Sequence, residues 1–101
     1  MTDKRYIFTP EQDLQVDTGK GHLAGVIVSS VSSTSGVCTV YDYAGAGPPE
    51  ITDKIFEIVI NANNPAIILF NDRYAPRFYS GVWLFSAADV YVTLFVHIPV
   101  P

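Results

Sequence analysis

The chain has 101 residues, of which 49% are hydrophobic and only 16% are charged, and its formal net charge is −4. This length predicts one domain, and the charged share lies below the roughly 25% of an average soluble domain. The basic residues form no cluster larger than the pair Lys4 and Arg5, which argues against direct binding of nucleic acid, because that function needs a basic stripe.

The first 20 residues are the most polar part of the chain. Two weak β patterns lie within them, at 5–9 and 14–16, so we expect residues 1–20 to form a polar arm or an edge strand. The β-sandwich domain itself is expected to span residues 21–101. The N-terminal sequence lacks the apolar core of a signal peptide, so nothing in it indicates secretion.

From residue 21 onward, short runs rich in β-branched and aromatic residues alternate with turn-forming residues. We expect strands at 23–30, 37–42, 54–60, 66–71, 78–85 and 89–98. No window of 12 or more residues has the 3.6-residue period of an amphipathic helix. The pattern predicts an all-β fold, either an antiparallel β-sandwich or a Greek-key or jelly-roll-like barrel of about six to eight strands.

Consecutive runs in this series are expected to pair as hairpins. One hairpin would join 23–30 to 37–42 through a small polar loop, and a second would join 78–85 to 89–98 through the residues SAA. Asp42 follows the second of these runs, and we expect its carboxylate to accept hydrogen bonds from the amides of a turn.

Two glycine features could suggest a ligand site. The string TGKG at 18–21 lacks the spacing of a phosphate-binding loop, so we interpret it as a turn that leads into a strand. Gly21 and Gly25 alternate with Leu23 and Ile27 on one expected face, where glycine is more typical of close packing or a bulge than of ligand contact.

Groups that could perform chemistry are few and scattered. His22, His97 and Cys38 are far apart in sequence, whereas a zinc site needs three or four converging ligands, so we expect no metal and no cofactor. The carboxylates fall mostly in expected loops and strand ends, without the spacing of a calcium loop. As the single cysteine, Cys38 cannot form a disulfide within the chain.

The aromatic residues of the last two expected strands give a stronger signal. A half-exposed strand should alternate apolar with polar residues, but these two strands are largely apolar or aromatic on both sides. They could be central strands whose rings are partly covered by loops, or they could form a subunit interface, which is enriched in aromatic residues and depleted of charge. We favour the interface and expect it to contain Tyr79, Trp83, Tyr91, Phe95 and His97.

The C-terminal run also raises the possibility of a membrane segment, because Asp89 is the one formal charge among residues 80–101. A membrane helix needs about 20 consecutive mostly apolar residues. The residues SAAD interrupt this run, and 90–98 has the two-residue period of a strand. We therefore interpret the run as two adjacent β-strands and expect no membrane partner.

The runs GHLAGVIVSS and VCTVYD, followed much later by FYSGVWLF and VYVTLFVHI, form a recognisable series. This series resembles small β-sandwich virion proteins of tailed bacteriophages, which have a G-x-L-x-G-[VI] strand, a strand that ends in [VL]-Y-D and an alternating final strand. The resemblance covers about 21–42 and 78–98.

The resemblance implies a capsid decoration, or cement, protein without an active site. Such a protein is a homo-oligomer, often a trimer, that assembles in the host cytoplasm and binds the major capsid protein on the virion surface. Two other functions stay open. A carbohydrate-binding module would stack sugars on exposed Trp83, Tyr79 and Tyr91, and an enzyme on a β-barrel would use His97 or Cys38, in the extreme case as a nucleophile pair.

Overall fold

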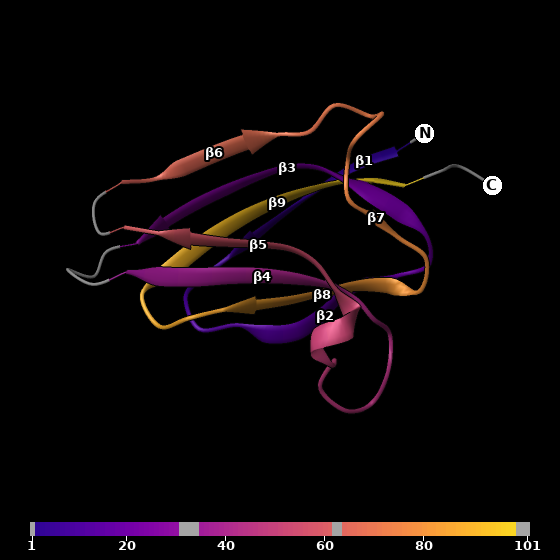
Figure 1. The fold of residues 1–101 in the computed structure, drawn as a ribbon, viewed down its shortest axis with the longest axis horizontal. Helices are drawn as coiled ribbons and strands as arrows, with labels where there is room; N and C mark the ends of the chain where they lie inside the picture. The colour runs from indigo at the N-terminus through magenta and orange to yellow at the C-terminus, as the bar shows by residue number, and fades with distance from the viewer. Residues whose placement is uncertain (1, 31–34, 62–63, 99–101) are drawn as a thin grey trace.

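Two antiparallel β-sheets packed face to face form the molecule in the computed structural model, which describes residues 2–30, 35–61 and 64–98 (Figure 1). The described residues form nine strands and one short 3-10 helix, η1. Their bounds are β1 Thr2–Phe8, β2 Asp13–Thr18, β3 Gly21–Ser30, β4 Gly36–Asp42, η1 Ile51–Asp53, β5 Lys54–Ile60, β6 Ala66–Leu69, β7 Arg77–Phe78, β8 Gly81–Ser86 and β9 Val90–Ile98.

The strand order within the two sheets is that of a jelly roll. Sheet A has the order β1-β9-β3-β6, with β7 also paired to β3, and sheet B has the order β2-β8-β4-β5. The pairs β1·β9, β2·β8, β3·β6 and β4·β5 are all antiparallel, as in one long hairpin rolled into two layers. The predicted all-β antiparallel sandwich is therefore confirmed.

The core lies between the two sheets and is built from alternate residues of each strand. In β9, Val92, Leu94 and Val96 are at most 1% exposed, whereas the residues between them are partly accessible. Sheet B contributes Val40 and Leu84 from its own inner face, and both are fully buried. Burial of each such side chain contributes roughly 1.5–3 kcal/mol relative to exposure, so the alternation seen in the sequence fixes which face of each strand turns inward.

Both predicted hairpins are wrong. The runs 23–30 and 37–42 lie in different sheets, as β3 and β4, and the chain crosses between the layers through a connection whose residues 31–34 lie outside the described part. The final two strands are likewise not adjacent, because β8 belongs to sheet B and β9 to sheet A. Alternate residues are buried whether the next strand pairs in the same sheet or crosses to the other sheet. The alternation alone therefore does not distinguish a hairpin from a crossover.

The expected common face of Leu23, Gly25 and Ile27 is also wrong, because β3 contains a bulge. Its register with β9 shifts between Leu23 and Gly25. One extra residue at this point inverts the alternation. Leu23 therefore turns into the core, whereas Gly25 and Ile27 lie on the outer face beside Phe95 and Thr93.

Two segments depart from the expected strand limits. The run 78–85 is split into β7 and β8 by a turn at Tyr79 and Ser80. Of the two alternatives for residues 1–20, an arm or an edge strand, the structure contains strands, since β1 and β2 form the outer strands of sheets A and B. The N-terminal segment thus lies against the domain along one side of the sandwich.

Candidate functional site

The outer side of sheet A presents an apolar surface that crosses all four of its main strands. Cross-strand pairing places Ile7 beside Thr93, Thr93 beside Ile27, and Ile27 beside Ile67, in one row from β1 to β6. A second row follows the pairs of Arg5, Phe95, Gly25 and Leu69, and a third joins Tyr91 to Ser29. We call these ten residues face A.

Face A is accessible and almost free of charge. Ile7, Ile67 and Leu69 are 70%, 69% and 80% exposed, and Tyr91 is 43% exposed. Among the residues that define the face, Arg5 alone carries a formal charge. Isolated exposed apolar side chains are ordinary, but a contiguous apolar surface typically marks an interaction site.

Gly25 allows the centre of face A to pack closely. A Cβ atom at this position would lie 3.1 Å from the Ile68 carbonyl oxygen, 3.1 Å from Cδ2 of Leu69 and 3.6 Å from Cδ2 of Phe95. The side chains of Leu69 and Phe95 therefore lie over the glycine backbone from the two neighbouring strands. This contact joins two apolar side chains into one surface that a side chain at position 25 would separate.

The outer side of sheet B, which we call face B, is different because its polar groups are paired. The Trp83 indole Nε1 donates to Asp13 Oδ1 at 2.7 Å. Thr39 Oγ1 donates to Glu57 Oε2 at 3.0 Å, and Lys54 Nζ lies 3.4 Å from the other Glu57 oxygen. Face B thus combines aromatic rings with hydrogen-bonded polar side chains, as a solvated sheet face does.

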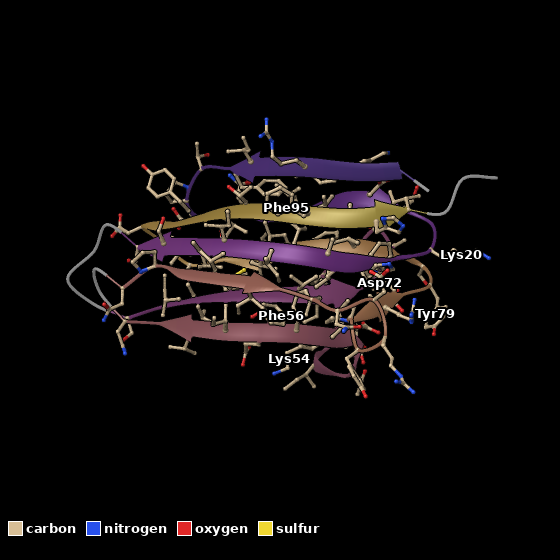
Figure 2. The ribbon with its side chains drawn as sticks, turned by 90° about the horizontal axis from the view of Figure 1, so that it is seen from above. Lys20, Lys54, Phe56, Asp72, Tyr79 and Phe95 are labelled. Atoms are coloured by element: carbon tan, nitrogen blue, oxygen red, sulfur yellow. The ribbon has the colours of Figure 1, made fainter. Side chains whose placement is uncertain are left out.

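The five residues predicted for the interface do not form one patch. Tyr91 and Phe95 lie on face A, where Figure 2 shows Phe95 near the middle of the sheet. Trp83 lies on face B, where its ring contacts Tyr43 edge-on at 5.6 Å between centroids. The expectation that one surface carries Trp83, Tyr91 and Phe95 together is wrong, because β8 and β9 belong to opposite layers.

Tyr79 lies in the turn between β7 and β8, at one end of the molecule (Figure 2). The turn is held by Asp42 Oδ1, which accepts hydrogen bonds from the amides of Tyr79 at 3.0 Å, Ser80 at 2.8 Å and Gly81 at 3.4 Å. The predicted role of Asp42 in bonding turn amides is therefore confirmed. The bonded turn leaves the Tyr79 side chain 72% exposed.

His97 lies near the end of β9 and packs against His22 of β3. The centroids of the two rings are 4.8 Å apart. His22 is buried, with Nδ1 3.2 Å from the Leu23 carbonyl oxygen and Nε2 4.0 Å from Asp72 Oδ1. Within the described ranges, no three His, Cys, Asp or Glu side chains are grouped so that they could hold a metal ion.

Cys38 and His97 belong to different sheets, since Cys38 lies in β4 of sheet B and His97 in β9 of sheet A. Cys38 lies on the inner face of sheet B, where it is completely buried. Burial raises the pKa of its thiol to about 12. The thiolate required of a nucleophile is therefore a minor species near neutral pH.

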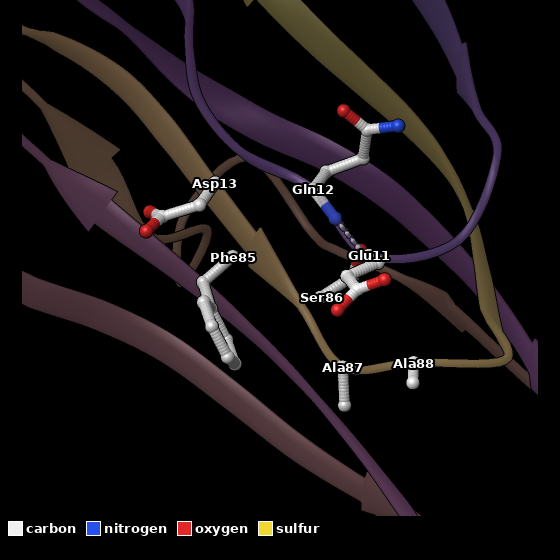
Figure 3. A pocket seen from close by; sticks show the side chains of 7 residues that line it. All are labelled: Glu11, Gln12, Asp13, Phe85, Ser86, Ala87 and Ala88. Carbon is white, nitrogen blue, oxygen red and sulfur yellow. Dashed lines mark hydrogen bonds between the residues drawn. The ribbon is translucent and has the colours of Figure 1, made fainter.

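A shallow hollow of about 420 Å³ lies at one end of sheet B (Figure 3). It is lined by Glu11, Gln12, Asp13, Phe85, Ser86, Ala87 and Ala88. The Gln12 amide donates to Ser86 Oγ at 3.0 Å, which joins the two sides of the hollow. The Asp13 carboxylate in the lining already accepts a hydrogen bond from Trp83. The hollow therefore has this carboxylate and the Phe85 ring in its lining.

Four residues of face A were not predicted from the sequence as site residues: Ile7, Ile27, Ile67 and Leu69. Ile27, Ile67 and Leu69 lie in runs that were expected to be ordinary strands. Ile7 lies in the weak β pattern at 5–9, within the expected polar arm or edge strand. Charge gives a usable signal for β6, because an edge strand without a charged residue is unusual among soluble proteins. The lack of charge is informative only once β6 is known to be an edge strand, and its edge position depends on pairing between strands that are distant in sequence.

Comparisons of this chain with family models, with curated proteins and with solved structures give no match. The part of the chain that the structure describes contains no helix of the length and apolar character needed to span a bilayer. The function is therefore inferred from the geometry of faces A and B and from the resemblance of the sequence runs.

Proposed function

We propose that this chain is a non-enzymatic structural protein of a tailed-phage virion, a capsid decoration protein that self-associates and stabilises the capsid lattice. The observation that supports the proposal most is face A, a contiguous and accessible apolar surface on a jelly roll. Its partners would be further copies of the chain, with a trimer favoured by the resemblance, and the major capsid protein at the virion surface.

The size of face A indicates how such a protein would work. The ten residues of face A span three to five positions on each of four strands about 4.8 Å apart, which gives a footprint of about 250 Å². A stable standard interface buries about 800 Å² on each partner. One contact through face A is therefore weak, and stabilisation of a shell would come from many such contacts acting together on a repeating lattice.

Self-association through face A is tested by measuring molar mass across a range of concentrations. We expect the wild-type chain to exceed its monomer mass of 11.1 kDa as its concentration rises. The double variant Ile7→Lys, Tyr91→Lys places two charges on face A at exposed positions and should remain monomeric. Val59→Lys is the matched control, since Val59 is 63% exposed on the other sheet and its substitution should leave association unchanged.

A wild-type chain that remains monomeric at all concentrations would remove face A as a self-association surface. The virion assignment has a separate check in the genome. We expect the gene to neighbour genes for a major capsid protein and a portal, and a neighbourhood of carbohydrate-active enzymes would instead favour the second candidate.

The second candidate is a carbohydrate-binding module, and face B supports it. Trp83, with its indole fixed by Asp13, lies close to the hollow lined by Phe85, and an aromatic ring beside polar groups suits a sugar. Titration with sugars should change Trp83 fluorescence if this candidate is correct, and an Asp13→Asn variant should alter the response. An unchanged spectrum over a panel of mono- and oligosaccharides removes the candidate.

A further inference from the structure

The free edge of sheet A at β6 carries unpaired main-chain groups. Phe70 donates its amide to the Ala24 carbonyl oxygen of β3 at 3.0 Å. Because successive residues of a strand turn their main-chain groups to opposite sides, Ile67 and Leu69 direct their N–H and C=O groups away from β3. In the described residues β6 pairs with β3 alone, so these four groups face the open edge.

This edge differs in charge from the other long edges of the sandwich. β1 contains Lys4 and Arg5, β2 contains Asp13 and Asp17, and β5 contains Lys54 and Glu57. β6 contains no charged residue. Charges on an edge strand oppose the addition of another strand, and β6 lacks this protection.

The space beside β6 also has an apolar floor. Seen from above in Figure 2, β5 of sheet B extends past the edge of β6, and Phe56 lies beside β6 instead of beneath it. Phe56 and Ile58 point toward the inside of the sandwich but are only partly buried, and Phe56 contacts Phe70 at 5.4 Å between ring centroids. A strand added beside β6 would cover these side chains.

We propose that the β6 edge accepts a short extended segment of another protein as an additional strand of sheet A. A strand is the structure that can satisfy the main-chain groups of both Ile67 and Leu69. The segment would be uncharged for about four residues, since it meets Phe56 and Ile58 on one side and Ile67 and Leu69 on the other. This inference does not depend on self-association through face A.

The length of the added ladder is limited by the ends of β6. Pro65 has no amide hydrogen to donate. Beyond the strand, the Asn71 carbonyl accepts a hydrogen bond from the Tyr74 amide at 3.0 Å, so it belongs to a turn. The ladder therefore centres on the four hydrogen bonds that the main-chain groups of Ile67 and Leu69 can make.

The test uses the full-length chain and the peptide acetyl-KTVIVTK-amide as the probe, followed by amide hydrogen exchange in NMR. At a peptide concentration three times its dissociation constant, exchange at Ile67 and Leu69 should slow about fourfold, because one quarter of the protein stays free. The amides of β1 and β2 should not change. Absence of any effect at β6 with millimolar peptide, or an equal effect at β1, overturns the proposal.

The decisive variant is Leu69→Pro, which removes an outward amide that β3 does not use. Proline is tolerated at an edge position of this kind, so the spectrum should remain folded while peptide protection is lost. Leu69→Thr is the matched control, because it retains the amide and should retain protection at Ile67. Protection that persists in Leu69→Pro contradicts strand addition.

A second form of the probe covers the case in which Leu69→Pro does not fold. The same peptide, N-methylated on alternate residues along the edge that faces β6, cannot form the ladder, so it should give no protection with the wild-type chain. Protection by the methylated peptide overturns the proposal.

Self-association of the variants tests whether the added strand comes from a second copy of the chain. If the wild-type chain self-associates and Leu69→Thr preserves this association while Leu69→Pro abolishes it, the occupant is a second copy, and a separate partner strand is wrong.

Discussion

The two long sides of the sandwich are held together by different kinds of contact. On the side of β1 and β2, Tyr6 Oη donates to Asp17 Oδ2 at 2.7 Å, and Lys4 Nζ lies 3.2 Å from the same oxygen. On the side of β5 and β6, no polar bond joins the two strands in the described residues, and the contact is the edge-on packing of Phe56 and Phe70.

This difference shows how one small domain can have one closed edge and one open edge. The carboxylate of Asp17 links the sheets and places charge on the edge, which discourages further strands. The apolar contact across the other side leaves Ile67 and Leu69 exposed and their outward main-chain groups available. Substitution of Asp17 should therefore lower stability, whereas substitution of Ile67 or Leu69 should affect association and hardly change stability.

The largest expected effect comes from removing the link on the closed side. Asp17→Ala leaves the Tyr6 hydroxyl and Lys4 without their shared acceptor, and should lower the free energy of unfolding by about 2 kcal/mol. Urea denaturation measures this change. Lys4→Ala is the control and should cost less than about 1 kcal/mol, because the Lys4 side chain is about half exposed and its pair is screened by water. Equal losses in the two variants would show that Asp17 does not act through Tyr6.

The next effect depends on pH. Burial and the hydrogen bond to Asp17 raise the pKa of Tyr6 to about 12. Because this folded-state value is above the unfolded value near 10, the stabilisation is complete below pH 10 and is lost as the pH rises toward 12. Tyr6→Phe should lower stability by about 1 kcal/mol near neutral pH and should lack this part of the alkaline loss.

The acid side of the same link has the opposite sign. Burial raises the pKa of Asp17, but hydrogen bonds from Tyr6, the Thr18 amide and Lys4 outweigh burial and leave the pKa below its ordinary value. Its stabilisation is therefore present above about pH 4 and disappears as the pH falls through the folded-state pKa. Urea midpoints from pH 2 to 12 for wild type, Tyr6→Phe and Asp17→Asn measure both limbs. An Asp17→Asn curve parallel to wild type below pH 4 would contradict this account.

The sequence predicts the local structure of this chain well because alternation and turn chemistry act over few residues. The inward positions of β9, from Val90 to Val96, follow from their period of two. Asp42 lies where an aspartate favours a turn, and hydrogen bonds from turn amides to its carboxylate were predicted. These features need no knowledge of which strand lies beside which.

The arrangement of the strands was not predictable in the same way. Whether a run enters the same sheet as its predecessor or crosses to the other is decided by pairing between residues as far apart as Phe8 and Val92. The bulge before Gly25 could not be predicted, because the residues of β3 are compatible with either face of the strand turning inward. Trp83 and Phe95 were therefore expected together and lie on opposite sides, and the edge position of Leu69 was not expected.

The smallest expected effect is on the open edge. Ile67→Thr and Leu69→Thr each replace an exposed aliphatic side chain by a smaller one that retains strand preference and the outward amide, so the free energy of unfolding should change by less than about 0.5 kcal/mol. Urea denaturation beside Asp17→Ala makes the comparison direct, because all three residues lie on edge strands. A loss above about 1 kcal/mol in either variant would mean that these side chains are packed within the isolated domain, and β6 would then be a closed edge like β1. Unchanged stability, with altered binding of an extended peptide, would show that exposure at β6 contributes to association and not to folding.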